Sequence, residues 1–242
     1  MKRLTENHLR RDFIRKGGMV IFSTAVLQAN VPLALVTAKG EGKKSGGKKE
    51  EEISPVEDLM REHGVLARIL LIYDNISMRV RNDQNYPPTV LSNGADLIRR
   101  FVENYHEKLE EEYVFPRFEK AGKLVDLAKI LREQHRAGRR LTERIKPFAS
   151  QSALGSDEKK EFLKNLELFS RMYRPHKSRE DTVLFPAFRS IVSAKEYDSL
   201  GEKFEEKEDE LFGEHGFEKV VEQVAGLEKA LGIYDLSQFG FQ

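Results

Sequence analysis

Residues 106–118 read HEKLEEEYVFPRF, and residues 176–188 read HKSREDTVLFPAF. In both stretches a Glu follows the His four positions later, and a Phe, a Pro and a second Phe follow it at nine, ten and twelve. Residues four apart on an α-helix lie on one face, with Cβ atoms roughly 5–6 Å apart. We therefore expect His106 with Glu110, and His176 with Glu180, to project together into a shared interior.

Each stretch is preceded by a segment with a further His, Arg61-Glu62-His63 before the first and Arg132-Glu133-Gln134-His135 before the second. The chain thus reads as two helical hairpins, each with two His and one Glu. Apolar residues recur at helical spacing throughout, and no alternating run predicts a sheet. Short connections favour an all-α, up-down-up-down four-helix bundle. The expected helices run from Pro55 to a break at 82–88, from Ser92 to Ala121, from Leu124 to Lys146 and from Asp157 to Ile191.

Each expected helix places one His within its apolar stripe. A buried polar group without a partner costs roughly 1–3 kcal/mol, so a single such His is most often a satisfied core residue. Four, one on each helix, are better explained by a shared ligand. The chain has no Cys, so nitrogen and oxygen donors alone must hold any metal, and such donors suit iron or manganese better than structural zinc. The candidate ligands are His63, His106, Glu110, His135, His176 and Glu180.

These six residues, in this order and with two i, i+4 pairs, resemble the hemerythrin-like (HHE cation-binding) domain over roughly residues 55–192. The resemblance implies a non-haem centre of two iron ions, bridged by Glu110 and Glu180 and capped by the four histidines. In some members a Glu directly after the second His is also a ligand, which here would be Glu107. Residue 107 lies about 100° around the helix from residue 106, and we interpret Glu107 as exposed.

Two positions depart from the oxygen-carrying hemerythrins. Those proteins have another His one turn after the third, where this chain has Arg139. They also have an Asp five residues after the last His, which here is Asp181, next to Glu180. The internal repeat aligns Glu180 with Glu110, so we favour Glu180 as the bridge and keep Asp181 as the alternative. The missing His predicts a more open iron than in an oxygen carrier.

Both ends of the chain extend beyond the bundle. Residues 1–38 combine a basic segment that contains Arg10-Arg11, an apolar stretch and small residues before Lys39. This segment resembles a twin-arginine export signal, which implies export of folded protein, here to the periplasm; the alternative is an uncleaved membrane anchor. Residues 39–54 predict a flexible linker. Residues 193–242 predict a helical extension that packs on the bundle, with His215 in a loop.

Net charge is only +1, which gives no indication of a nucleic-acid partner. The leading hypothesis is a diiron protein that binds O2, NO or a peroxide for sensing, buffering or detoxification, and it favours a binding protein over an enzyme. One alternative is an enzyme that reduces peroxide or NO, or a factor that donates iron to damaged iron–sulfur centres. A further alternative is a bundle whose metal is purely structural. Any membrane contact is expected through the signal segment alone, if it stays uncleaved.

Overall fold

The computed structural model describes residues 53–150 and 154–240, which are helical throughout apart from short connections and contain no strand. The all-α prediction is therefore confirmed for this part of the chain. The predicted signal segment, and the predicted linker up to residue 52, lie outside it. The helices are α2 (Pro55–Arg81), α3 (Pro88–Leu97), η1 (Ile98–His106), α4 (Glu107–Leu109), η2 (Glu110–Val114), α5 (Phe115–Ala121), α6 (Val125–Ile145), η3 (Lys146–Ser150), α7 (Ser156–Arg179), η4 (Glu180–Leu184), α8 (Phe185–Phe188), α9 (Ala194–Phe212), α10 (Gly216–Leu231) and η5 (Leu236–Phe239).

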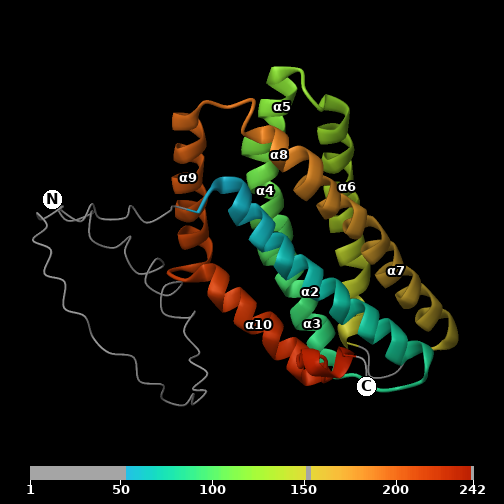
Figure 1. Ribbon diagram of the computed structural model, residues 1–242. Helices are drawn as coiled ribbons and strands as arrows, with labels where there is room; N and C mark the ends of the chain where they lie inside the picture. The colour runs from blue at the N-terminus through green and yellow to red at the C-terminus, as the bar shows by residue number, and fades with distance from the viewer. Residues whose placement is uncertain (1–52, 151–153, 241–242) are drawn as a thin grey trace, which may run out of the picture. The chain divides into compact units, whose positions relative to one another are not determined.

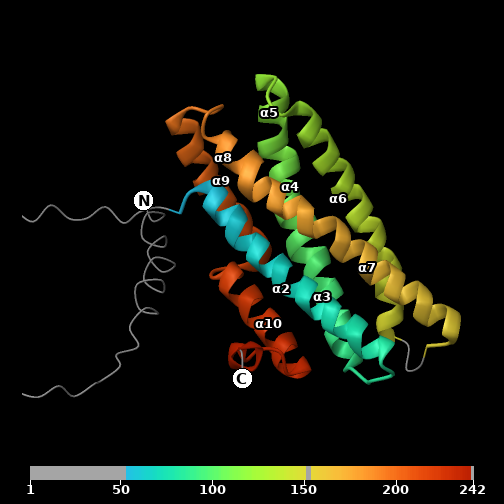
Figure 2. The same cartoon turned by 45° about the vertical axis from the view of Figure 1, so that its right-hand side comes forward.

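The long helices form a bundle in which the elements that carry the candidate ligands lie side by side (Figure 1). Helix α2 packs against α7, and α6 packs against α7. The segments α3, η1, α4, η2 and α5 follow one another as a single long rod. Figure 2 shows α9 and α10 along α2, on the side away from α6. Among the residues described, no helix is both long enough and apolar enough to cross a membrane.

Local signals explain where the first helices begin. The Ser54 side chain accepts a hydrogen bond from the backbone N–H of Glu57, and Pro55 fills the first helical position. The second helix begins at Pro88, four residues before the expected start at Ser92. Proline suits a first helical position because its fixed φ is preformed and its missing N–H would have had no partner there. The prediction treated this proline as a breaker, whereas it is a start.

Three stretches of the bundle are π-helical, and two of them begin at candidate ligands, η2 at Glu110 and η4 at Glu180. A proline lies two residues past the end of each, Pro116 after η2 and Pro186 after η4. A proline cannot donate to the carbonyl four residues earlier, and its ring crowds that carbonyl. A widened turn before the proline relieves the crowding, and such turns often occur at functional sites. The periodicity of the sequence predicts an ordinary helix here.

The C-terminal extension is tied to the bundle through charged side chains as well as apolar ones. Both oxygens of Glu228 on α10 accept hydrogen bonds from Arg68 on α2, at 2.9 and 2.6 Å. Arg79 donates to the carbonyl of Leu231 at 2.7 Å. Buried apolar residues of α9 and α10 join the same core as the other helices. The extension therefore covers one face of α2, while Leu71 and Met78 on the same helix stay exposed.

Candidate metal centre

Four buried histidines from four helical elements meet in the interior of the bundle. His63 comes from α2, His106 from the end of η1, His135 from α6 and His176 from α7. Each is at most 3% exposed. The ring centroids of His63 and His106 lie 4.7 Å apart, and those of His135 and His176 lie 5.0 Å apart. The histidines therefore form two pairs.

Two fully buried glutamates connect the pairs. Glu110 Oε2 lies 3.5 Å from His106 Nε2 and 3.3 Å from His135 Nε2. Glu180 Oε2 lies 3.3 Å from the Nε2 of His63 and 3.1 Å from that of His176. Each carboxylate thus contacts one histidine of each pair, as a bridging ligand must. The structure brings together all six residues that the sequence predicts as ligands.

The Nδ1 atom of each of the four site histidines has a hydrogen-bond acceptor. The Nδ1 atoms of His63, His106, His135 and His176 lie within hydrogen-bond distance of one oxygen each. In that order the acceptors are Asp181 at 2.6 Å, Glu62 at 2.7 Å, Glu111 at 3.2 Å and Gln134 at 2.9 Å. A carboxylate or amide oxygen accepts, so each Nδ1 carries a proton in these contacts. The Nε2 atoms face inward, and those of His135 and His176 lie 3.2 Å apart. Metal-binding histidines are characteristically held in this way.

These acceptors follow the internal repeat, although the sequence prediction missed three of them. Glu62 precedes His63 and accepts from His106, and Gln134 precedes His135 and accepts from His176. Glu111 follows Glu110 and accepts from His135, and Asp181 follows Glu180 and accepts from His63. In both cases the histidine belongs to the other hairpin. Each of the four acceptors stands directly next to a candidate ligand in the sequence, and this adjacency is the feature from which they could have been predicted. Asp181, the alternative bridge, thus contacts Nδ1 of His63, whereas Glu180 lies between the pairs.

Burial and like charge shape the electrostatics. Burial lowers the pKa of His135 to about 4 and lowers that of His106 well below its usual value. Burial opposes protonation of His63 as well, but its two carboxylate neighbours raise its pKa overall. Burial and the charge of Glu180 raise the pKa of Glu110 well above its usual range. At His106 and His135 the lowered pKa favours the neutral imidazole, and a cation is bound by imidazole in that form.

Glu107 corrects the sequence prediction. It is 1% exposed rather than solvated. The Tyr173 hydroxyl donates to Glu107 Oε1 at 2.7 Å, and Arg139 Nη2 lies 2.7 Å from Glu107 Oε2. Burial raises the pKa of Glu107 to about 8, and Arg139 and Tyr173 oppose that rise. Glu107 lies on α4 and points toward Arg139 of α6 and Tyr173 of α7. These neighbouring helices cover it, although it lies about 100° around its own helix from the face that carries the ligands.

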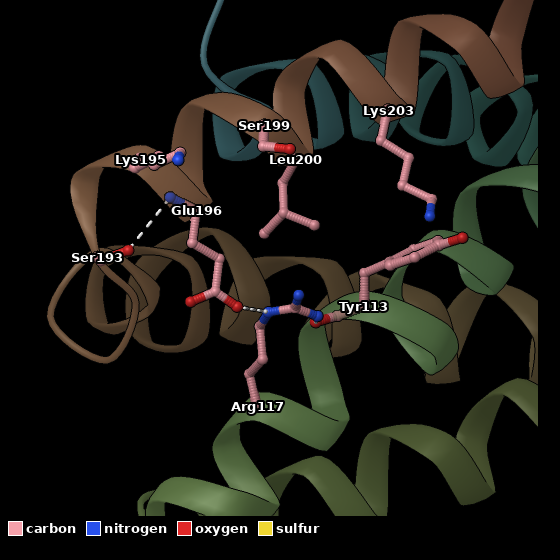
Figure 3. Close-up of a pocket in the computed structure, with 8 residues that line it drawn as sticks. All are labelled: Tyr113, Arg117, Ser193, Lys195, Glu196, Ser199, Leu200 and Lys203. Carbon is pink, nitrogen blue, oxygen red and sulfur yellow. Dashed lines mark hydrogen bonds and ion pairs between the residues drawn. The ribbon is translucent and has the colours of Figure 1, made fainter.

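A surface pocket of about 400 Å³ lies apart from these residues, between α5 and the start of α9 (Figure 3). Within it Arg117 donates to Glu196 at 2.9 Å, and the Lys203 ammonium lies 4.9 Å from the centre of the Tyr113 ring. None of the six candidate ligands lines it. Two of its charged groups, Arg117 and Lys203, are engaged by Glu196 and by the Tyr113 ring. The candidate ligands lie in the bundle interior instead.

The donor set and its surroundings fit a metal cation. Neither oxygen of Glu110 or Glu180 accepts a hydrogen bond, although both side chains are fully buried. One oxygen or nitrogen of each of Glu110, His135, His176 and Glu180 falls within 4.8 Å of the others, and His63, His106 and Glu110 form a second such group. An unpaired buried carboxylate is costly unless a cation is bound. The two groups share Glu110.

Histidine and carboxylate donors that converge inside a helical bundle define a class of protein that holds metal cations without sulfur ligands. The hemerythrin HHE cation binding domain matches residues 54–188 of this chain. The chain therefore belongs to the hemerythrin HHE cation-binding family.

The chain is also similar to two mycobacterial proteins. The chain is 49% identical over 191 residues to uncharacterized protein Rv1995 of Mycobacterium tuberculosis and to uncharacterized protein Mb2018 of Mycobacterium bovis. Each match covers 78% of this chain and 75% of the relative. No solved structure matches the chain.

Proposed function

We propose that this protein holds two non-haem iron ions and uses them to bind a small oxidant or diatomic ligand. His63 and His106 would hold one ion, His135 and His176 the other, and Glu110 and Glu180 would bridge them. We also infer that the four ligand-bearing helical rods form an up-down-up-down bundle. The observation that carries the proposal is the pair of bridging carboxylates, each with unpaired oxygens between two inward-facing Nε2 atoms.

When bound, a pair of iron ions supplies reversible electron transfer and open coordination positions at which O2, NO or peroxide binds. The chain's own contribution is positioning. The four acceptors on Nδ1 hold the imidazole rings, and Phe185 and Phe115 stack on His63 and His135 with centroids 5.5 and 5.4 Å away. Such aromatic walls restrict water around the donors. A binding or detoxifying role for O2, NO or peroxide is the function that this arrangement supports best.

The metal content tests the proposal directly. Protein purified without oxygen is expected to contain about two iron ions per chain, as in other carboxylate-bridged bundles. Alanine at any one of the four site histidines is expected to lower that ratio by about half or more, because each ion keeps few nitrogen donors. Elemental analysis measures the ratio. Wild-type protein with one tightly bound zinc and no iron would contradict the diiron proposal.

Optical spectra separate the proposed roles. Additions of O2, NO and H2O2 to the iron-loaded protein are expected to produce stable, reversible bands if the protein senses or buffers these molecules. Repeated consumption of peroxide or NO would favour the enzymatic alternative. A metal that stabilises the fold but responds to none of the three would favour a structural role.

We propose that the protein is exported in folded form through its N-terminal segment. The support is the sequence of residues 1–38 alone. Lysine at both Arg10 and Arg11 is expected to leave the precursor in the cytoplasm, because the arginine pair is the element that a twin-arginine route reads. Fractionation and N-terminal sequencing measure the outcome, and the mature chain is expected to begin near Lys39. Unchanged export of the lysine variant would indicate an ordinary signal or an anchor.

A further inference from the structure

The two halves of the site are related by the internal repeat, but the polar groups beside them differ. Arg139 lies one turn after His135 on α6, and its Nη2 donates to Glu111 Oε1 at 2.7 Å. The same nitrogen lies 2.7 Å from Glu107 Oε2. Tyr173 on α7 donates to the other oxygen of Glu107 at 2.7 Å. We call these four residues, Arg139, Glu107, Glu111 and Tyr173, the Arg139 cluster.

The cluster reaches both histidines of one pair. Glu111, which Arg139 holds, also contacts Nδ1 of His135 at 3.2 Å. The Tyr173 ring packs edge-on against His176, with centroids 5.6 Å apart. Arginine presents several donors in a rigid planar fork, so it can hold two carboxylates at once. Arg139 therefore joins α6 to the segment α4–η2, and Tyr173 extends the cluster to α7.

The other pair lies beside a different polar cluster, in which Glu62, the acceptor of His106 Nδ1 at 2.7 Å, groups with the buried Asp58 and Glu208. The repeat places Ala67 where the second half has Arg139, because each lies four residues after its histidine. It places Lys177 where the first half has Glu107. Asp181, which contacts Nδ1 of His63, has Lys177 Nζ 3.9 Å away and a side chain that is 27% exposed, compared with 11% for Glu111. The acceptor on His63 is therefore held less firmly and is closer to solvent.

We propose that Arg139 is a positioning residue that makes the two metal positions unequal, so that the ion at His135 and His176 is held more firmly than the ion at His63 and His106. The proposal rests on the proposed function, since it needs two bound ions. Its physical basis is the restriction of the rings. Partners that orient a ligating histidine commonly change metal affinity by about 10–100-fold when they are removed.

Iron release measures this inequality. Full-length protein loaded with iron(II) without oxygen is mixed with excess colorimetric iron(II) chelator, and the coloured complex is followed over time. Wild-type protein is expected to release its iron in two phases of equal size. Arg139→Leu is expected to accelerate the slow phase about tenfold or more and to leave the fast phase unchanged. Arg139→Lys is expected to be intermediate, because an ammonium keeps the charge but not the planar fork.

Matched variants isolate the cause. Arg140→Leu removes an exposed arginine from the next position of the same helix and is expected to release iron as the wild type does. Tyr173→Phe keeps the ring and removes the hydrogen bond to Glu107, so a smaller acceleration of the slow phase is expected. His63→Ala is expected to retain the slowly released ion, and His135→Ala the rapidly released one. The Tyr173 and lysine variants keep the test informative if Arg139→Leu fails to fold.

The outcomes are distinguishable. Two ions released in a single phase, equal acceleration of both phases by Arg139→Leu, or acceleration of the fast phase alone would overturn the inequality and leave the diiron proposal intact. Retention of the fast phase in His63→Ala would overturn the assignment of the firm position to His135 and His176. Protein that takes up one iron or none would overturn the diiron proposal and this inference with it.

Discussion

Glu110→Gln and Glu180→Gln are each expected to reduce bound iron from about two ions per chain to one or none, the largest change in metal content for a near-isosteric substitution. Each carboxylate contacts a histidine of both pairs, so its charge would offset both of the proposed cations. Glutamine keeps the shape and offers one neutral oxygen. In a dry interior, loss of that charge disfavours bound cations far more than at a surface. Elemental analysis and the optical signature of a coupled iron pair measure the loss.

Glu110→Gln is expected to leave the metal-free fold intact. Burial and Glu180 already favour the neutral acid form of Glu110 in the absence of a cation, and an amide resembles that form closely. Metal-free Glu110→Gln is therefore expected to melt at or above the wild-type temperature. The stabilisation by added iron, about 2.7 kcal/mol at a metal concentration one hundred times Kd, is expected to disappear. A variant that unfolds without metal would instead indicate a structural role for the carboxylate.

Two neighbours provide the controls. Glu112→Gln changes an exposed glutamate two positions from Glu110 and is expected to bind iron normally. Asp181→Asn is expected to be mild, because an asparagine oxygen can still accept from His63 Nδ1. If Asp181→Asn abolished the coupled pair and Glu180→Gln did not, then the internal repeat would have assigned the bridge to the wrong residue.

The six candidate ligands could be predicted because their chemistry follows helical spacing. Position i+4 returns to the same face, so a histidine and a glutamate at that spacing must share an environment. One histidine per helix then requires the four faces to meet. Whether these residues bind metal stays a prediction, but their convergence follows from periodicity alone.

Their supporting partners could not be predicted in the same way. Glu62, Glu107, Glu111 and Gln134 each stand beside a ligand in the sequence, about 100° from it around the helix. On an isolated helix that direction is half exposed, and a charged residue there is most simply interpreted as solvated. In the bundle the same direction faces the interface with a neighbouring helix. The partner of each residue lies 24 to 66 positions away, so only tertiary packing settles whether the charge is buried.

The same limit applies to Gly138. The sequence places it in the apolar stripe of α6 without any reason for a glycine. In the structure, a Cβ at residue 138 would overlap the Tyr173 hydroxyl and would lie 2.6 Å from Tyr173 Cζ. The close approach lets Tyr173 pass α6 and reach Glu107. Residue 138 is thus a glycine because of a side chain 35 positions away, on another helix.

Gly138→Ala is accordingly expected to destabilise the metal-free protein by about 3 kcal/mol or more, because overpacking a core costs roughly 1–3 kcal/mol and the buried hydrogen bond to Glu107 is lost as well. For a domain of this size the melting temperature falls by roughly 2–4 °C for each kcal/mol. Gly64→Ala is the matched control, since that glycine is exposed inside α2 and a Cβ there meets nothing within 4 Å. Its expected effect has the opposite sign, a gain of about 0.5–1 kcal/mol.

A double-mutant cycle identifies the cause of the loss. Combined with Tyr173→Leu, which removes the ring atoms that a Cβ at residue 138 would meet, Gly138→Ala is expected to cost far less than it does alone. Residues in contact commonly couple by 0.5–3 kcal/mol, and a direct clash lies at the upper end of that range. Urea unfolding of the four metal-free proteins measures the coupling. If Gly138→Ala costs the same with Leu at residue 173, then the close approach of Tyr173 to α6 is not what requires the glycine, and the path from Tyr173 to Glu107 must differ from the one described.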